Sequence, residues 1–243
     1  MKNKVAMITG ASVGIGRAVA LQMAEKGAKL VLLDMNQETL ANLEEELKSV
    51  NAEFVAVVCD VSDEKAVNEA VQVAMGKFGG VDILVNNGAI WRMNSLFWET
   101  SIEMWRKLID VNVMGAVYCT NAVLPKMMEN GYGRIVNVAS VAGVYGNPEM
   151  PVYSTTKGAL ISMSKALAKS VVDKGIVVNC VSPGMVSPSN HLDIEYTVKT
   201  DKCYAERTGS DRENADLICF LASEKNGYVV GQNIQIDGCR KWI

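Results

Sequence analysis

A tyrosine and a lysine stand four residues apart in the stretch YSTTK, within a segment whose apolar residues recur at helical spacing. Side chains at this spacing share one face of a helix, so Tyr153 and Lys157 are expected to be neighbours. A free tyrosine has a pKa of about 10, and a nearby cation lowers such a pKa by roughly one to three units. The pair therefore predicts a general acid for a ketone or a general base for an alcohol. The alternative is a chance pair at a solvated edge.

Two further polar side chains stand where they could assist this chemistry. Ser140 ends the apolar run 134–140 and precedes Tyr153 by 13 residues. Its hydroxyl is suited to hydrogen-bond a substrate oxygen and to stabilise developing charge. Asn112 lies in a largely apolar segment with a helical pattern, where an asparagine competes for backbone hydrogen bonds and needs partners if buried. A satisfied core amide is the alternative for Asn112.

A glycine-rich turn, TGASVGIGRA, follows the first apolar run. Gly10 ends that run, and Gly14 and Gly16 remove side chains where the backbone turns into a helix. Such a turn exposes the free N–H groups of the helix N-terminus to a pyrophosphate, as in dinucleotide-binding folds. The expected cofactor contacts are Gly10, Ser12, Gly14, Ile15 and Gly16. A merely tight turn is the alternative.

The second apolar run ends in an acid, Asp34. A carboxylate there can accept hydrogen bonds from the ribose hydroxyls of NAD, and it would repel the 2′-phosphate of NADP. The positions where a cation would favour NADP hold Val13, Met35 and Asn36, while Arg17 lies inside the expected helix. The sequence therefore favours NAD. The alternative for Asp34 is the N-cap of the following helix.

The third and fourth apolar runs also end in polar groups. Asp60 is placed to accept the adenine amino group, and Val61 offers a backbone N–H. Asn87 and Gly88, within NNGA, suit a backbone that passes close to a ligand. A helix N-cap at Asp60 and an ordinary turn at NNGA are the alternatives.

In their order and spacing, these motifs resemble the classical short-chain dehydrogenase/reductase family along nearly the whole chain. The matching segments are TGASVGIG, Asp60, NNGA, Asn112, Ser140, Tyr153, Lys157, the PG pair at 183–184 and QIDG near the end. The resemblance implies that Tyr153 exchanges the proton and that Lys157 also holds the nicotinamide ribose. It further implies that Asn112 kinks its helix, with its backbone carbonyl holding a water linked to Lys157.

The resemblance also places Pro183 and Gly184 beside the nicotinamide, with the backbone of Val186 at its carboxamide. The chain departs from the family pattern at Pro188, where threonine is usual, so a hydroxyl expected to bind the cofactor is lost. The serines on either side are candidates to replace it. Two smaller departures are NNGA in place of N-N-A-G and DGC in place of D-G-G.

The elements that would position these residues alternate between short apolar runs and longer helical patterns. Near-continuous apolar character is typical of strands covered on both faces. Alternation throughout predicts one doubly wound, Rossmann-type α/β domain over 1–243, with about seven parallel strands and helices on both faces. The predicted strands are 4–10, 29–34, 53–60, 82–87, 134–140, 176–182 and 233–237.

Composition narrows the class of protein. The chain has 243 residues, 49% hydrophobic and 21% charged, with a formal net charge of −3, which does not favour a nucleic-acid surface. No apolar run reaches the roughly 18 residues of a membrane span, and we expect a cytoplasmic protein. The six cysteines form no C-x-x-C pair and the single histidine is His191, so no metal site is expected.

The substrate is less well specified. The segment from about 188 to 208 is expected to cover the pocket, whose wall would be a mixture of apolar and polar groups. The candidate wall residues are Trp91, Met93, Tyr145, Met150, Met185, His191, Leu192, Ile194, Tyr196 and Tyr204. Such a wall suits a bulky, partly apolar alcohol or ketone, such as a hydroxysteroid, and polyols and 3-oxoacyl thioesters are also compatible.

Three functions are therefore open. The first is an NAD-dependent alcohol dehydrogenase or ketone reductase, and the second is a 3-oxoacyl-[acyl-carrier-protein] reductase-like ketoreductase, which would prefer NADPH. The third is a dinucleotide-binding protein without catalysis.

Helices 101–129 and 153–173 carry more apolar residues than one buried face requires, and we expect a homotetramer. The resemblance implies that these two helices make a symmetric dimer contact and that the C-terminal strand makes another.

Overall fold

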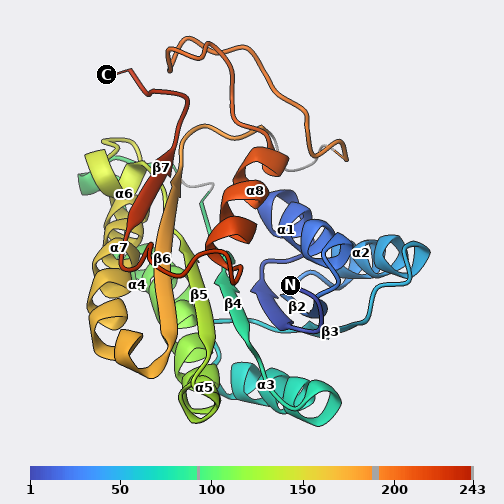
Figure 1. The fold of residues 1–243 in the computed structure, drawn as a ribbon. Helices are drawn as coiled ribbons and strands as arrows, with labels where there is room; N and C mark the ends of the chain where they lie inside the picture. Colours follow the sequence, from blue (N-terminus) through green and yellow to red (C-terminus); the bar gives the residue numbers. More distant parts are fainter. Residues whose placement is uncertain (92–93, 188–191, 242–243) are drawn as a thin grey trace.

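In the computed structural model, the chain forms a seven-stranded sheet of order β3-β2-β1-β4-β5-β6-β7 with parallel pairing throughout (Figure 1). The structure describes residues 1–91, 94–187 and 192–241. The strands are β1 (Val5–Thr9), β2 (Lys29–Asp34), β3 (Phe54–Val58), β4 (Ile83–Asn86), β5 (Gly133–Val138), β6 (Ile176–Pro183) and β7 (Asn233–Ile236). The predicted fold class is confirmed, and every predicted strand end lies within two residues of the observed one.

The helices connect these strands in chain order. They are α1 (Gly14–Glu25), α2 (Gln37–Ser49), α3 (Glu64–Phe78), η1 (Phe97–Glu99), α4 (Ile102–Ile109), η2 (Asp110–Met114), α5 (Gly115–Asn130), α6 (Ala142–Tyr145), α7 (Pro151–Val171), η3 (Val172–Lys174) and α8 (Asp211–Leu221). The expected helix over 101–129 is therefore interrupted, because η2 is a π-helical turn between α4 and α5.

Alternate residues of each strand feed two separate cores. On β1, Ala6 and Ile8 pack with α1, α2 and α8, whereas Val5 and Met7 pack with α3, α5 and α7. Figure 1 shows the first group of helices on one side of the sheet and α5 and α7 on the other. This two-sided covering explains why the strands are near-continuously apolar in sequence.

The helical run Ile102–Asn130 is long and apolar enough to cross a membrane by length and composition, with a mean hydropathy of 1.2 in its most apolar window. Within the fold, 39% of that window is buried. Its α5 part packs against α3 and supplies Cys119, Val123 and Met127 to one core. We interpret the run as a core helix, and no second helix in the described part of the chain has these properties.

Gly16 allows α1 to start directly against the end of β1. A Cβ at Gly16 would lie 2.0 Å from the carbonyl oxygen of Gly10 and 2.7 Å from Nδ2 of Asn87. Both atoms are held, since Asn87 Nδ2 donates to the carbonyl oxygens of Thr9 and Gly10 at 3.1 and 2.9 Å. The glycine therefore sets how closely helix and strand approach.

We expect Gly16→Ala to lower the free energy of unfolding by at least about 2 kcal/mol, because the backbone of Gly10 cannot move aside cheaply. Gly76→Ala is the matched control, since that glycine lies inside α3 with nothing within 4 Å of an added Cβ. The control should gain about 0.5–1 kcal/mol from the better helix propensity of alanine. Denaturant unfolding checks both values, and equal effects of the two substitutions would contradict this account of the turn.

Candidate active site

A cavity of about 1590 Å³ lies at the carboxyl ends of the strands, where ligands bind in open α/β sheets. This volume exceeds the roughly 300–1,000 Å³ of an ordinary small-molecule pocket. Fourteen predicted site residues line it, namely Gly10, Gly14, Ile15, Asp34, Asp60, Val61, Asn87, Gly88, Ser140, Tyr153, Lys157, Pro183, Gly184 and Val186. Ser12, Gly16 and Asn112 are not part of its wall.

The start of α1 forms a cradle suited to a pyrophosphate. The N-cap residue, Val13, has no side chain that can cap the helix, so the first N–H groups of α1 are not satisfied by a capping side chain. Gly14 has a φ of +55°, a left-handed conformation that opens this turn toward the cavity. The residues present therefore fit a dinucleotide, with Gly14 and Ile15 as donors at the helix N-terminus.

Ser12 serves Asp34 rather than the cavity. The Ser12 hydroxyl donates to Asp34 Oδ2 at 2.6 Å and lies 2.7 Å from the Thr39 hydroxyl, while the Ser12 N–H donates to the same Oδ2 at 3.0 Å. Asp34 Oδ1 accepts from the N–H of Asn36 at 3.0 Å. Since a carboxylate offers about four acceptor positions, roughly one is left for a ribose hydroxyl.

The N-cap positions of α2 and α3 are not held by Asp34 and Asp60, the acids at the ends of the preceding strands. Asn36 caps α2 by accepting from the N–H groups of Glu38 and Thr39, and Asp63 caps α3. The N-cap alternatives for Asp34 and Asp60 are therefore wrong.

Asp60 instead accepts from the N–H and hydroxyl of Ser62 at 2.9 and 2.7 Å, in the turn before α3. Its carboxylate thus orients the loop that carries Val61 into the cavity wall.

No cation is free to offset a phosphate beside Asp34 among the described residues around it. Val13 and Met35 line this part of the cavity and are 42% and 70% exposed. Arg17, the nearby base, is bound through its guanidinium to the Glu46 carboxylate and to the carbonyl oxygen of Leu192.

Asn112 lies in the π-turn η2 and is 2% exposed. Its Oδ1 accepts from the N–H of Ile90 at 2.8 Å, and its Nδ2 donates to the Ile90 carbonyl oxygen at 3.0 Å and to the Thr156 hydroxyl at 3.1 Å. The side chain thus fastens the loop after β4 to α7, one residue before Lys157. The resemblance implied a kink of the helix at Asn112, and the π-turn is a local widening of the helix at this position.

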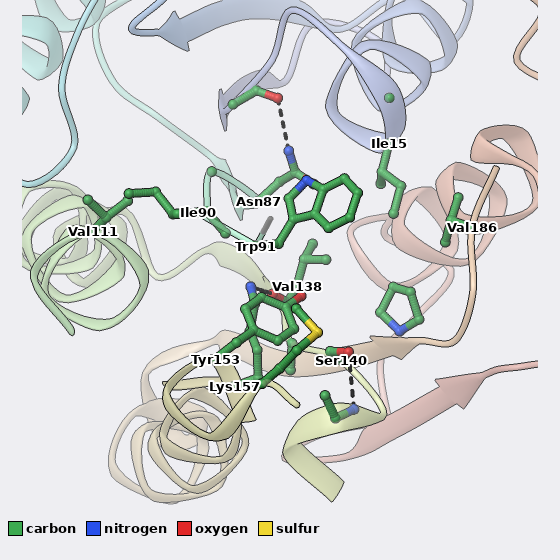
Figure 2. A pocket seen from close by; sticks show the side chains of 18 of the residues that line it. Ile15, Asn87, Ile90, Trp91, Val111, Val138, Ser140, Tyr153, Lys157 and Val186 are labelled. Atoms are coloured by element: carbon green, nitrogen blue, oxygen red, sulfur yellow. Dashed lines mark hydrogen bonds between the residues drawn. The ribbon is translucent and has the colours of Figure 1, made fainter. Parts of the chain in front are cut away.

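Figure 2 shows Ser140, Tyr153 and Lys157 grouped on one side of the cavity. Ser140 follows β5, and its hydroxyl accepts from the N–H of Ala142 at 3.1 Å. Lys157 is 2% exposed, and its Nζ donates to the carbonyl oxygen of Val138 at 2.7 Å. A Cβ at Gly143 would lie 2.5 Å from the Lys157 carbonyl carbon, so the α6 turn packs directly on α7.

Burial shifts the pKa values of both Tyr153 and Lys157. Burial raises the pKa of Tyr153 above its ordinary value of 10.0, and the hydrogen bond with Ser140 opposes the rise. Burial also lowers the pKa of Lys157 from 10.5 to about 8. The ammonium lies 5.6 Å from the centre of the Tyr153 ring and bonds to Val138, not to the phenol. In this structure the pKa of Tyr153 therefore moves opposite to the direction predicted from Lys157.

The expected substrate wall is confirmed only in part. Trp91, Met150 and Met185 line the cavity, whereas the other described candidates lie outside its lining. Those others are Tyr145, Leu192, Ile194, Tyr196 and Tyr204. Met93, His191 and Pro188 lie outside the described residues, and so does Ser189, one of the two serines that flank Pro188. The other flanking serine, Ser187, donates its hydroxyl to the Tyr196 carbonyl oxygen at 2.6 Å.

Several charged residues of the cavity wall were not predicted from the sequence. Glu103, Arg106 and Lys107 of α4 and Asp110 at the start of η2 line the cavity, and their i, i+3, i+4, i+7 spacing could have identified this helical face. Asp211 and Arg240 also line the cavity, and no spacing pattern in the sequence marks them. Burial raises the pKa of Asp211 to about 6. No cluster of three or more metal-ligating side chains occurs among the described residues.

Comparison with known proteins agrees with this geometry. The family model described as short chain dehydrogenase matches residues 4–196. A 3-oxoacyl-[acyl-carrier-protein] reductase of Thermotoga maritima is 37% identical over 98% of both chains. NAD⁺-bound xylitol dehydrogenase superposes with a TM-score of 0.90 at 32% identity over 98% of both chains. L-sorbose reductase from Gluconobacter frateurii, solved with NADPH and L-sorbose, superposes at 0.91 with 33% identity over 99% of this chain and 97% of the other.

The lowered pKa of Lys157 predicts a pH dependence of stability for the cofactor-free protein. The unfolded chain holds this proton up to about pH 10.5 and the folded one releases it at about 8, so between these values the unfolded state binds more protons. Stability therefore rises with pH in this window and falls as pH drops through 8. Relative to Lys157→Met, the wild type should gain up to about 3 kcal/mol from pH 8 to 10.5.

Urea unfolding of both proteins across this pH range measures the difference, in which the other titrating groups cancel. Parallel curves for wild type and Lys157→Met would mean that the buried ammonium keeps its ordinary pKa.

Proposed function

Because this chain belongs to the short-chain dehydrogenase family, we propose that it is an NAD-dependent oxidoreductase that transfers a hydride between nicotinamide and a secondary alcohol or ketone. The observation that carries the proposal is the convergence of Ser140, Tyr153 and Lys157 on one cavity that also contains the glycine cradle. A chain that only bound a dinucleotide would not need this set, which argues against a non-catalytic role.

Each residue of the set has a distinct task in the proposed reaction. The bound nicotinamide supplies or accepts the hydride. The Tyr153 hydroxyl gives its proton to the carbonyl oxygen during reduction, and the Tyr153 phenolate takes the proton from the alcohol during oxidation. The Ser140 hydroxyl hydrogen-bonds the same oxygen as charge develops on it. Lys157 holds the nicotinamide ribose and, once charged, stabilises the phenolate of Tyr153.

The cofactor is held from both ends in this proposal. The start of α1 binds the pyrophosphate, while Asp34 accepts from the adenosine ribose and Asp60 and Val61 contact the adenine. Asn87, Gly88, Pro183, Gly184 and Val186 surround the nicotinamide half. We keep the segment 188–208 as the proposed cover of the pocket, although none of its described residues lines the cavity.

A 3-oxoacyl-[acyl-carrier-protein] reductase-like activity is the second candidate, because the Thermotoga relative at 37% identity carries that name. The surroundings of Asp34 favour NAD, but this does not separate the two candidates, because a 3-oxoacyl-[acyl-carrier protein] reductase from Brucella melitensis that is 32% identical was solved with bound NAD. Among the other substrate classes, polyols and related sugars gain support from the xylitol and sorbose enzymes, and nothing favours a hydroxysteroid.

We also propose a cytoplasmic homotetramer, assembled through α4, α5 and α7. Not all the apolar residues that suggested it are available, since Leu108, Val123 and Leu160 are buried within the chain. The contact would instead use partly exposed residues of these helices, which include Val111, Val113, Val117, Met163 and Leu167.

Replacing the proposed proton donor gives a direct test of catalysis. We expect Tyr153→Phe to leave NAD binding intact and to lower kcat by at least about 100-fold, the scale of lost acid–base catalysis. Tyr228→Phe is the control, because Tyr228 is 99% exposed and not part of the cavity wall. Kinetics on a panel of secondary alcohols, with NAD binding by calorimetry, measure both effects. A Tyr153→Phe enzyme that retained more than a tenth of the activity would exclude Tyr153 as the proton donor.

Cofactor choice tests the role of Asp34. At an effective dielectric constant of about 20, two unit charges some 4 Å apart repel by about 4 kcal/mol. Half of this, allowing for exposure, is about 2 kcal/mol, or roughly 30-fold. We therefore expect kcat/KM to favour NAD over NADP by at least about tenfold. Asp34→Ala combined with Met35→Arg should shrink or invert this ratio. Glu45→Ala is the control, because Glu45 is an exposed residue of α2, and it should leave the ratio unchanged.

The ratio is measured within each variant, so a general loss of stability cancels. A wild-type enzyme that preferred NADP would show that Asp34 only organises the turn through Ser12.

A further inference from the structure

The segment after β7 is fixed against the loop that follows β6. Gly238 and Cys239 have consecutive left-handed φ values of +62° and +60°, which turn the chain sharply after the sheet. The Cys239 carbonyl then accepts from the N–H of Tyr204 at 2.9 Å, and the N–H of Lys241 donates to the Lys202 carbonyl at 3.0 Å. Arg240, between these two hydrogen bonds, forms a β-bridge with Cys203. Its backbone position is therefore set on both sides.

Arg240 lines the cavity and reaches it from the sheet edge opposite the proposed adenosine site. It lines the same cavity as Ser140, Tyr153 and Lys157. The strand that leads to it, β7, lies at the edge of the sheet opposite β3, far from the proposed adenosine site. A Cβ at Gly184 would also lie 2.8 Å from the Cα of Asp237, so the chain passes directly beside the proposed nicotinamide site three residues before Arg240.

The guanidinium of Arg240 has no ion-pair partner among the described residues. Other cations of the same region have partners. Arg207 pairs with Glu213, and the Lys241 ammonium lies over the ring of Tyr204 at 5.2 Å. A partly buried arginine facing a cavity without a carboxylate partner is suited to bind one from a ligand.

We propose that Arg240 binds an anionic group of the substrate, so that the enzyme acts on a keto acid or the corresponding hydroxy acid. This inference rests on the proposed function, because it assigns the substrate class of the same site. The planar guanidinium presents parallel N–H donors that match the two oxygens of a carboxylate, a geometry that lysine does not offer. Arg240 fixes the acid end while Ser140 and Tyr153 engage the ketone.

The experiment compares acids with their neutral esters. Reduction of acetoacetate and levulinate is measured beside that of their methyl esters, with NADH, for wild type, Arg240→Ala, Arg240→Lys and the control Lys241→Ala. Wild type should prefer the acid of at least one pair. Arg240→Ala should lower that acid-to-ester ratio of kcat/KM by about tenfold to one-hundredfold, the scale of a lost hydrogen-bonded charge pair. Arg240→Lys should recover part of the preference, and Lys241→Ala should retain it.

Several outcomes would overturn the inference. The first is a wild type that prefers the esters, and the second is an Arg240→Ala variant that loses acid and ester activity equally. The third is an Arg240→Ala variant whose affinity for NADH falls, because this would assign the guanidinium to a cofactor phosphate. Thermal unfolding of each variant verifies that it is folded.

The proposed function is tested separately from the substrate class. If the wild type reduces neither keto acids nor esters and oxidises no secondary alcohol, the proposed function fails. Calorimetry of levulinate and methyl levulinate with the NADH-bound protein then decides the inference. Tighter binding of the acid that is lost in Arg240→Ala supports it, and equal binding of acid and ester overturns it.

Discussion

The burial of a single ammonium group is the constraint on which the rest of the site depends. Lys157 is 2% exposed, and the carbonyl of Val138 is the acceptor that the described residues offer its Nζ. Taking a cation out of water is costly, which is why its pKa falls to about 8. Burial therefore disfavours the charged form of Lys157 in the ligand-free protein. In the proposed reaction, a bound cofactor and the ionised phenol of Tyr153 would both favour the charged form of Lys157.

The helix that carries this lysine is held to the sheet by a buried chain of hydrogen bonds. Asn86 on β4 donates to Asn137 on β5 at 2.8 Å, Asn137 donates to the Ser164 hydroxyl at 2.8 Å, and Ser164 donates to the Leu160 carbonyl at 2.7 Å. On the opposite side, Asn112 ties the same helix to the loop after β4. Such networks fix a unique arrangement because each broken bond leaves an unpaired polar group.

How much could be predicted from the sequence differs between backbone and side chains. The strands were predictable because a parallel strand covered on both faces must be apolar at nearly every position, as in KLVLLD. The π-turn at Asp110–Met114 was not, since apolar spacing cannot distinguish a widened turn from a regular one. The partners of Ser12 and the direction of the Tyr153 pKa depend on burial and on exact distances. Arg240 reaches the cavity through a turn of two left-handed residues that no pattern announces.

That same turn has a practical consequence for labelling. Of the six cysteines, Cys239 is exposed and the other five are buried. Burial also raises the thiol pKa values of Cys59 and Cys180 to about 11 and of Cys119 and Cys219 to about 12, which suppresses the reactive thiolate. A maleimide dye would therefore attach at one position of the wild-type chain, next to Arg240. A dye attached to Cys239 would therefore lie beside the cavity and could report ligand binding by fluorescence, with no cysteine added or removed.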